Sequence, residues 1–193
     1  MALTELHLAL LAGAPRHGYD IKHEHDAWFP DGRPLPFGQV YATLARLQRD
    51  GLAEVVETRV DGGPERTVYA LTEEGARRLR AWLDEPAAPT GAGAEEIVRK
   101  TVAALHTGID VHGFVGRQRA AHLRRMRELQ RTPPGAGPAE RLAREHLIAH
   151  LDADLRWLDR ATDLLPAPAG DPAIRTDPAR TDPARTDSEG TGS

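Results

Sequence analysis

The chain contains no cysteine, which excludes disulfide bonds, thiolate metal sites and cysteine nucleophiles. Serine occurs only at Ser188 and Ser193, at the very end of the chain, so a serine nucleophile is not expected. No apolar run approaches the ~20 residues that a membrane span requires. The short apolar stretch near the N-terminus also lacks the basic flank of a signal peptide. We therefore expect a soluble, cytoplasmic protein that has no membrane contact and is not an enzyme.

Basic residues are in the minority, and lysine is nearly missing. Of 25 Lys and Arg residues only Lys22 and Lys100 are lysine, and 29 Asp and Glu give a net charge of −4. Most DNA-binding domains carry a basic footprint. A DNA-binding role therefore depends on a few arginines converging on one surface, namely Arg46, Arg49, Arg59 and Arg66.

One stretch of the chain has the pattern of a helix with a buried back and a polar front. Val40, Leu44 and Leu47 recur at spacings of four and three residues, which predicts one buried face. At about 100° per residue, we expect four polar residues on the opposite face, namely Gln39, Thr43, Arg46 and Asp50. Gly51 then supplies the left-handed residue that commonly ends a helix.

Two strand-like runs follow this helix. Residues 53–59 and 66–71 flank the turn Gly62-Gly63-Pro64, which predicts a β-hairpin. A helix with one polar face followed by a β-hairpin is typical of a recognition helix and its wing. Thr72 is a suitable N-cap for a further helix that ends before Pro86.

The chain divides into four parts by composition. Residues 1–85 hold the helices and the hairpin, and residues 86–93 are a linker rich in Pro, Ala and Gly. Residues 94–166 contain three helical stretches, at about 94–106, 110–131 and 138–165. Residues 167–193 carry two copies of Arg-Thr-Asp-Pro-Ala and too few apolar residues to form a core, and we predict a disordered tail. The fold class expected is mainly α with a small β-hairpin wing.

The last helical stretch has an apolar seam. Its members recur at alternating spacings of three and four residues, which predicts a coiled-coil-like contact with another helix. The seam consists of Ile148, Leu151, Leu155, Leu158 and Leu165.

Four short segments of the N-terminal 83 residues follow one another in a defined order and spacing. They are His17-Gly18-Tyr19-Asp20-Ile21, Gly38-Gln39-Val40-Tyr41 with Leu44 and Leu47, Gly51-Leu52, and Gly62-Gly63-Pro64-Glu65-Arg66 with Tyr69-Ala70-Leu71-Thr72 and Gly75. In this order and spacing they resemble the PadR family of bacterial transcriptional regulators. The helical part of the chain is similar to the family's dimerisation domain in layout only.

The resemblance implies a homodimeric repressor with an N-terminal winged helix-turn-helix and a C-terminal helical dimerisation domain. Its partner would be double-stranded DNA carrying an inverted repeat. A recognition helix in the major groove meets base edges, so we expect base contacts from Gln39 and Thr43, and a contact from Arg46 to a base or a nearby phosphate. Phosphate or minor-groove contacts are expected from Tyr41, Arg49, Arg59 and Arg66. The alternative is that the arginines are merely solvated and that Tyr41 belongs to the core.

A small aromatic effector is also implied by the resemblance. Trp28, Trp82, Trp157 and Phe114 are the candidate ligand-binding residues, with core packing as the alternative. Such a ligand would release DNA by changing the angle between the two heads, with residues 86–106 as the hinge.

No cofactor and no metal are expected. His146, His150 and Asp154 have zinc-ligand spacing, but the glutamate of a zinc protease is replaced by Leu147. The competing function is a winged-helix module that binds proteins rather than DNA. It would be favoured if Glu54, Glu57 and Asp61 dominated the reading surface.

Overall fold

The computed structural model describes residues 2–59, 66–90, 93–131 and 137–167. The predicted turn at residues 62–64 and nearly all of the predicted tail lie outside these ranges. The chain is mainly helical with one small antiparallel sheet, which confirms the predicted fold class. The elements are α1 (Ala2–Leu11), β1 (Arg16–His17), α2 (Gly18–Trp28), α3 (Phe37–Arg49), β2 (Ala53–Arg59), β3 (Arg66–Leu71), α4 (Glu73–Asp84), α5 (Ala94–Thr107), α6 (Val111–Gln130) and α7 (Pro138–Leu164).

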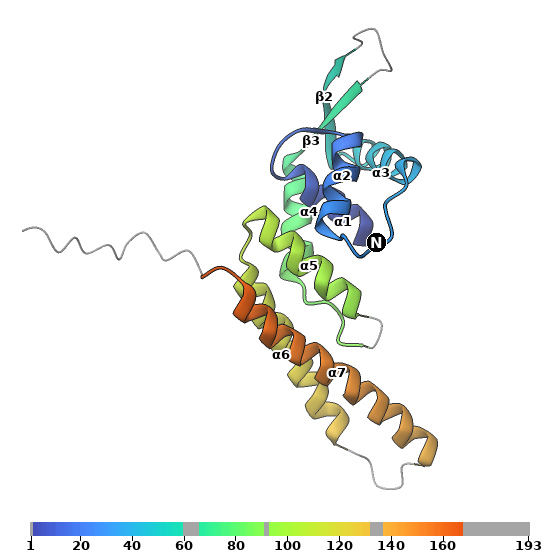
Figure 1. The fold of residues 1–193 in the computed structure, drawn as a ribbon, viewed down its shortest axis with the longest axis vertical. Helices are drawn as coiled ribbons and strands as arrows, with labels where there is room; N and C mark the ends of the chain where they lie inside the picture. The colour runs from blue at the N-terminus through green and yellow to red at the C-terminus, as the bar shows by residue number, and fades with distance from the viewer. Residues whose placement is uncertain (1, 60–65, 91–92, 132–136, 168–193) are drawn as a thin grey trace, which may run out of the picture.

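Figure 1 shows a head that carries the hairpin at one end of the molecule and a long helical arm at the other. Helices α1 to α4 and the sheet form the head, and α6 and α7 form the arm. Helix α5 lies between them and packs on α1.

Helix α1 lies in the middle of the head because it is apolar on nearly all sides. Leu6, Leu8, Leu10 and Leu11 are each no more than 2% exposed. They form one core with the apolar faces of α2, α3 and α4, together with Ala103 and Ala104 of α5. The head therefore completes its core with residues beyond the predicted linker.

The sheet at the base of the wing has three strands, one more than the sequence predicts. The strand order is β1-β3-β2, and both pairings are antiparallel. The bounds of β2 and β3 agree with the predicted runs. Strand β1 was not predicted, because two residues are too few to show an alternation of apolar and polar side chains. It pairs Arg16 with Tyr69 and thereby ties the start of α2 to the sheet.

The short connections around the sheet behave as their residues predict. Gly51 adopts φ +70° after α3, the left-handed conformation expected of a residue that ends a helix. The Thr72 hydroxyl accepts a hydrogen bond from the Gly75 amide at 3.0 Å and thus caps α4. Gly75 has to be glycine, because a Cβ there would lie 2.1 Å from the carbonyl oxygen of Leu52.

The arm is an antiparallel hairpin of α6 and α7, and it uses part of the predicted seam internally (Figure 1). Leu151 and Leu158 are 0% exposed, and Leu158 packs with Phe114 and Val115 of α6. The prediction that these two leucines contact a second chain was therefore wrong. A heptad seam indicates that a partner helix exists but does not say which chain supplies it, and here α6 occupies it. Ile148, Leu155 and Leu165 of the predicted seam are half-buried.

None of the helices in the described ranges is long and apolar enough to cross a lipid bilayer.

Candidate nucleic-acid interface

Helix α3 has the buried face that was predicted, but that face is wider than the apolar residues alone suggest. Val40, Leu44 and Leu47 are all 0% exposed. Thr43 is 2% exposed, so the prediction of a base contact from Thr43 was wrong. Thr43 lies three residues after Val40 and four before Leu47, which places it on the buried stripe. Thr43 is small and carries a methyl group, so it can be buried although threonine counts as a polar residue.

The residues of α3 that point most directly away from the core form a row of mostly small side chains. At about 100° per residue they lie opposite Val40, Leu44 and Leu47. This outward row consists of Gly38, Ala42, Ala45 and Arg49, all exposed. Gln39 and Arg46, also exposed, lie along one edge of the row, and Tyr41 lies along the other. A row of small side chains lets the helix backbone come close to a flat or grooved partner.

Tyr41 lies on the surface, with 50% of it exposed. The alternative that Tyr41 belongs to the core is therefore wrong. Its ring covers Gly18, the first residue of α2, so closely that a Cβ at Gly18 would lie 2.6 Å from the Tyr41 Cε1 atom. Glycine at position 18 thus lets α2 and α3 approach each other and keeps the phenol at the rim of the outward row.

Three further aromatic rings gather beside Tyr41 on the surface. The sequence analysis does not predict them as site residues. The Tyr19 ring lies 4.2 Å from that of His23 and 5.9 Å from that of Phe37, between ring centroids. The Lys22 ammonium lies 5.6 Å from the Phe37 ring centroid. Tyr19 and Phe37 are 57% and 42% exposed. Their positions in the first turns of α2 and α3 are the available signal, because the N-terminus of a helix favours anions such as phosphate.

The first turns of α2 and α3 also present backbone N–H groups. The residues that precede them, His17 and Pro36, make no side-chain cap hydrogen bond to these turns. The first N–H groups of a helix have no partner within the helix, and the helix dipole favours anions at this end. Two such ends beside the exposed phenol of Tyr19 and the half-buried ammonium of Lys22 are suited to binding phosphate.

Asp26 fixes the connection between α2 and α3. Its carboxylate accepts a hydrogen bond from the Leu35 amide at 3.0 Å and lies 2.7 Å from the Lys22 ammonium. Burial raises the pKa of Asp26, but the hydrogen bonds from Lys22, Leu35 and His25 outweigh it and lower the pKa to about 2. The charged carboxylate thereby holds the loop that delivers α3 to the surface.

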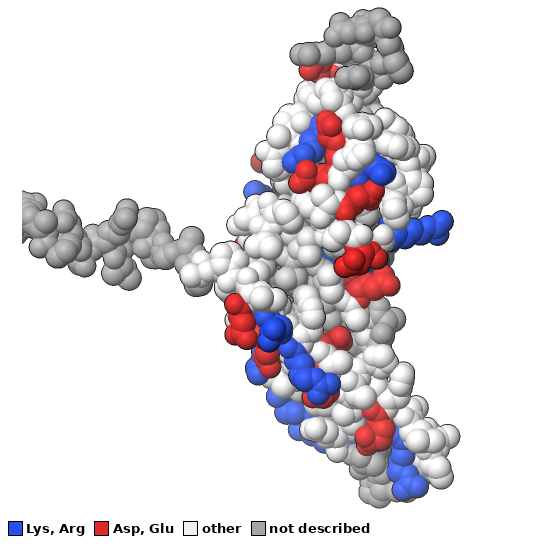
Figure 2. Space-filling model, viewed as in Figure 1, with Lys and Arg blue, Asp and Glu red and all other residues white. Residues whose placement is uncertain are grey.

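The arginines predicted to bind DNA are distributed over α3 and the wing. Arg46 donates to the Thr4 hydroxyl at 3.2 Å, and Arg49 lies 3.1 Å from the Asp50 carboxylate with 71% of its side chain exposed. Arg59 and Arg66 pair with each other at the outer end of the described hairpin, and their side chains lie outside the described part of the structure. On the side of the head that is in view in Figure 2, basic and acidic side chains are interspersed.

The four predicted ligand-binding residues have different neighbours within one chain. Trp28 stacks on His106 with 4.4 Å between ring centroids. The Trp82 ring lies 5.2 Å from the Lys100 ammonium. Phe114 is 0% exposed in the core of the arm, and Trp157 is 37% exposed on α7. The structure therefore does not assemble these rings into one pocket within the chain.

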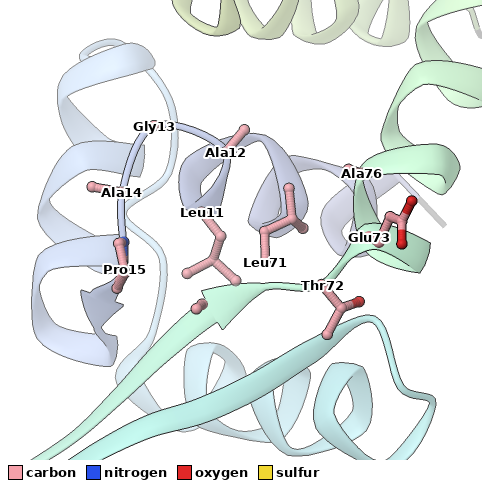
Figure 3. Close-up of a pocket in the computed structure, with 10 residues that line it drawn as sticks. Leu11, Ala12, Gly13, Ala14, Pro15, Leu71, Thr72, Glu73 and Ala76 are labelled. Atoms are coloured by element: carbon pink, nitrogen blue, oxygen red, sulfur yellow. The ribbon is translucent and has the colours of Figure 1, made fainter.

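The hollow drawn in Figure 3 lies on the side of the head formed by the loop after α1, the end of β3 and the start of α4. Its volume is about 430 Å³, and its lining is mostly aliphatic, including Leu11, Pro15 and Ala76. The Thr72 hydroxyl at its edge is already bonded to Gly51 and Gly75. The hollow contains none of the predicted site residues.

The histidines with zinc-ligand spacing form a pair on the surface of α7. The Nε2 atoms of His146 and His150 lie 3.1 Å apart. Asp154, which the sequence places one turn further on, lies 3.3 Å from His122 of α6 instead. In the described part of the chain no three His, Cys, Asp or Glu residues are grouped closely enough to hold a metal ion.

Comparison with known proteins finds a family model that matches the head. Residues 7–81 match the family model described as the transcriptional regulator PadR-like family. A probable transcriptional regulator of Mycobacterium tuberculosis is 27% identical over 93 residues, which are 48% of this chain and 49% of that protein. The chain thus matches about half the length of this curated relative.

Solved structures similar to the chain include two regulators. One is PadR of Bacillus subtilis in complex with operator DNA, with 18% identity and a TM-score of 0.42, covering 85% of this chain and 99% of that one. The other is the virulence activator AphA of Vibrio cholerae, with 23% identity and a TM-score of 0.36, covering 84% of this chain and 95% of that one.

Proposed function

Because residues 7–81 match the family model of PadR-like transcriptional regulators, we propose that this protein is a member of that family and a sequence-specific DNA-binding regulator. The observation that carries the proposal is the match of this family to the segment that folds as a helix-turn-helix with a wing. The outward row of α3 would enter the major groove. The first turns of α2 and α3 would then meet the phosphates on either side.

We assign roles to the exposed residues by their chemistry. Gln39 is suited to a bidentate contact with adenine, and Arg46 to a guanine or a nearby phosphate. Tyr41 and Tyr19 can donate their hydroxyls to phosphates, and Arg49 lies on the outward row itself. Arg59 and Arg66 on the wing strands are proposed as further phosphate or minor-groove contacts.

We further propose that the protein works in the cytoplasm as a dimer on an inverted repeat and represses by blocking a promoter. The exposed face of α7 is the surface we assign to the second copy. Leu142, Trp157 and Leu164 on this face are 73%, 37% and 75% exposed. These exposures leave apolar surface that a partner helix can cover. A small aromatic effector that releases the DNA is part of this proposal, with its site between subunits.

Fluorescence anisotropy with the DNA upstream of the protein's own gene tests the proposal. We expect tight binding that weakens steeply with salt, because each phosphate contact adds about 0.9 to the slope of log affinity against log salt. The double variant Gln39→Ala/Arg46→Ala should bind at least about tenfold more weakly, because a bidentate base contact contributes about 1–3 kcal/mol. Gln130→Ala/Arg127→Ala, two exposed residues of the same types on α6, is the matched control.

Weak binding that is equal for upstream and unrelated DNA, and equal for all three proteins, would overturn the proposal. That result would favour the protein-interaction module instead.

A further inference from the structure

The segment that joins the head to the arm is fastened to α5 and α6 by two buried side chains. The Lys100 ammonium donates to the carbonyl oxygen of Glu85 at 2.5 Å. The Gln118 amide donates to the carbonyl oxygen of Ala87 at 2.9 Å and accepts from the Ala87 N–H at 2.7 Å. The last turn of α4 and the start of the predicted linker are thus bonded to both neighbouring helices.

The bonds between Gln118 and Ala87 are buried on both sides, and the bond from Lys100 to Glu85 is buried on the lysine side. Lys100 is 2% exposed, Gln118 is 0% exposed and Ala87 is 3% exposed. Burial lowers the pKa of Lys100, although the carboxylates of Glu96 and Glu85 oppose this shift. Removing one partner of a buried hydrogen bond leaves the other partner unsatisfied, which is unfavourable. The connection between α4 and α5 therefore resists opening more strongly than an unbonded linker of the same composition would.

A second layer of contacts holds Gln118 itself in place. Its Nε2 atom lies 3.2 Å from Nδ1 of His122, and Nε2 of His122 lies 3.3 Å from the Asp154 carboxylate on α7. Nδ1 of His122 also lies 3.0 Å from the backbone carbonyl oxygen of Gln118. The contacts run without interruption from Ala87 through α6 to α7. The exposed face of α7 is the surface that we assign to contact with the second copy.

We propose that Lys100, which fixes the end of α4 to α5, and Gln118, which fixes Ala87 to α6, are positioning residues for DNA binding and together lock the head to the arm. In a dimer whose arms are paired, this lock fixes the distance and the rotation between the two reading helices. It thereby determines which half-site separation the protein accepts. The proposal rests on the proposed function. Its claim that the head is held rigidly on the arm can be tested without DNA.

The first experiment measures the distance between the head and the arm without DNA. Cysteines introduced at Ala45 on α3 and Ala149 on α7, both exposed, carry spin labels on a chain that has no other cysteine. An excess of unlabelled protein confines the signal to pairs within one chain. We expect a narrow distance distribution that broadens in Gln118→Leu and in Lys100→Met. Gln130→Leu, on the exposed surface of α6, is the control and should leave it narrow.

The second experiment compares the upstream operator with one whose half-sites are moved apart by about two base pairs, a rotation of about 70° on the duplex. Wild type should lose about a hundredfold in affinity, because both heads no longer engage together. Gln118→Leu should lose far less while binding an isolated half-site as wild type does. If Gln118→Leu is unfolded, Gln118→Glu retains the acceptor for the Ala87 N–H and should give an intermediate result.

The failures of the two proposals are distinguishable. A distribution that stays as narrow in Gln118→Leu and Lys100→Met as in the control overturns the lock. Equal discrimination between the two operators by wild type and by Gln118→Leu overturns the positioning role. A distribution that broadens in a protein whose wild type binds no DNA supports the lock and overturns the proposed function.

Discussion

At the scale of single residues, Gly18 controls how closely α2 and α3 pack. A Cβ at this position would overlap the Tyr41 ring, with 2.6 Å to the nearest ring carbon. The side chain that has to move is the phenol at the rim of the outward row. A substitution here should therefore affect the surface of α3 more than the core beneath it.

We expect Gly18→Ala to weaken DNA binding about tenfold through displacement of Tyr41, as lost phosphate contacts do. Anisotropy titration measures this change, and urea unfolding shows whether the head stays folded. The control is Gly116→Ala on α6, where a Cβ would meet nothing within 4 Å. That control should raise stability by about 0.5–1 kcal/mol, since alanine is the better helix former. Unchanged affinity in Gly18→Ala would show that Tyr41 has no part in binding.

His7 is a second residue with a measurable consequence, because it is completely buried in α1. Its Nδ1 atom lies 2.8 Å from the carbonyl oxygen of Leu3, and its Nε2 atom has no partner in the described part of the structure. Burial lowers the pKa of His7 from 6.5 to about 4, against a smaller opposing effect of the Leu3 carbonyl. The folded protein therefore keeps this imidazole neutral in mildly acidic solution.

The unfolded chain binds a proton at His7 near pH 6.5, whereas the folded chain does so only near pH 4. The free energy of unfolding should thus be highest above pH 6.5 and fall as the pH decreases toward 4. The part due to His7 amounts to about 3 kcal/mol at most. Denaturant unfolding of wild type and His7→Leu between pH 7 and pH 4 should show a shallower decrease in the variant. Parallel curves would mean that His7 titrates normally.

At the scale of elements, the outward row of α3 limits how closely the helix can approach DNA. Ala42 lies in the middle of this row and is exposed. We expect Ala42→Leu to reduce operator affinity about tenfold, because the larger side chain holds the helix away from the base edges. The matched control is Ala81→Leu on the exposed side of α4, which should bind as wild type does. Equal affinities of both variants would argue against α3 as the reading helix.

The elements differ in how well the sequence predicts them. The wing strands were predicted with their observed bounds, because alternating side chains end at glycine and proline on one side and at Thr72 on the other. The burial of Thr43 was missed because threonine is polar by label and yet small enough to fill the stripe between Val40 and Leu47. The exposed rings of Tyr19 and Phe37 were missed because aromatic residues are usually buried, and only the packing of α2 on α3 leaves them outside.

The sequence is less informative about which surfaces of a helix face a partner. The seam of α7 predicted a helix–helix contact correctly, but α6 of the same chain covers Leu151 and Leu158. The partner could not be assigned from the seam because an internal hairpin and a dimer bury the same pattern of leucines. The composition of the segment around Ala87, rich in Pro, Ala and Gly, suggests flexibility and predicts a hinge. The bonds from Gln118 and Lys100 come from residues distant in sequence and were not foreseen.

At the scale of the whole molecule, the apolar side chains left on α7 predict where two copies meet. Leu142 and Leu164 are the most exposed large apolar residues of this helix. We expect Leu142→Glu/Leu164→Glu to shift the protein from dimer to monomer in sedimentation velocity, since charges buried at an interface are strongly unfavourable. Arg141→Glu/Asp163→Glu, at neighbouring exposed positions, serves as the control and should remain dimeric. A wild type that sediments as a monomer at all concentrations would contradict the assignment.

The packing of α5 against α1 has a consequence for how the protein is made. Residues 1–85 include every strand of the head, but α1 is fully covered only when Ala103 and Ala104 reach it. A ribosome adds about 5–20 residues per second, so the interval between the end of α4 and the end of α5 lasts about one to a few seconds. During this interval the nascent head has a leucine-rich helix with one side open to water. Chaperones that bind apolar segments should therefore associate with nascent chains that end near residue 85 and release those in which α5 has emerged.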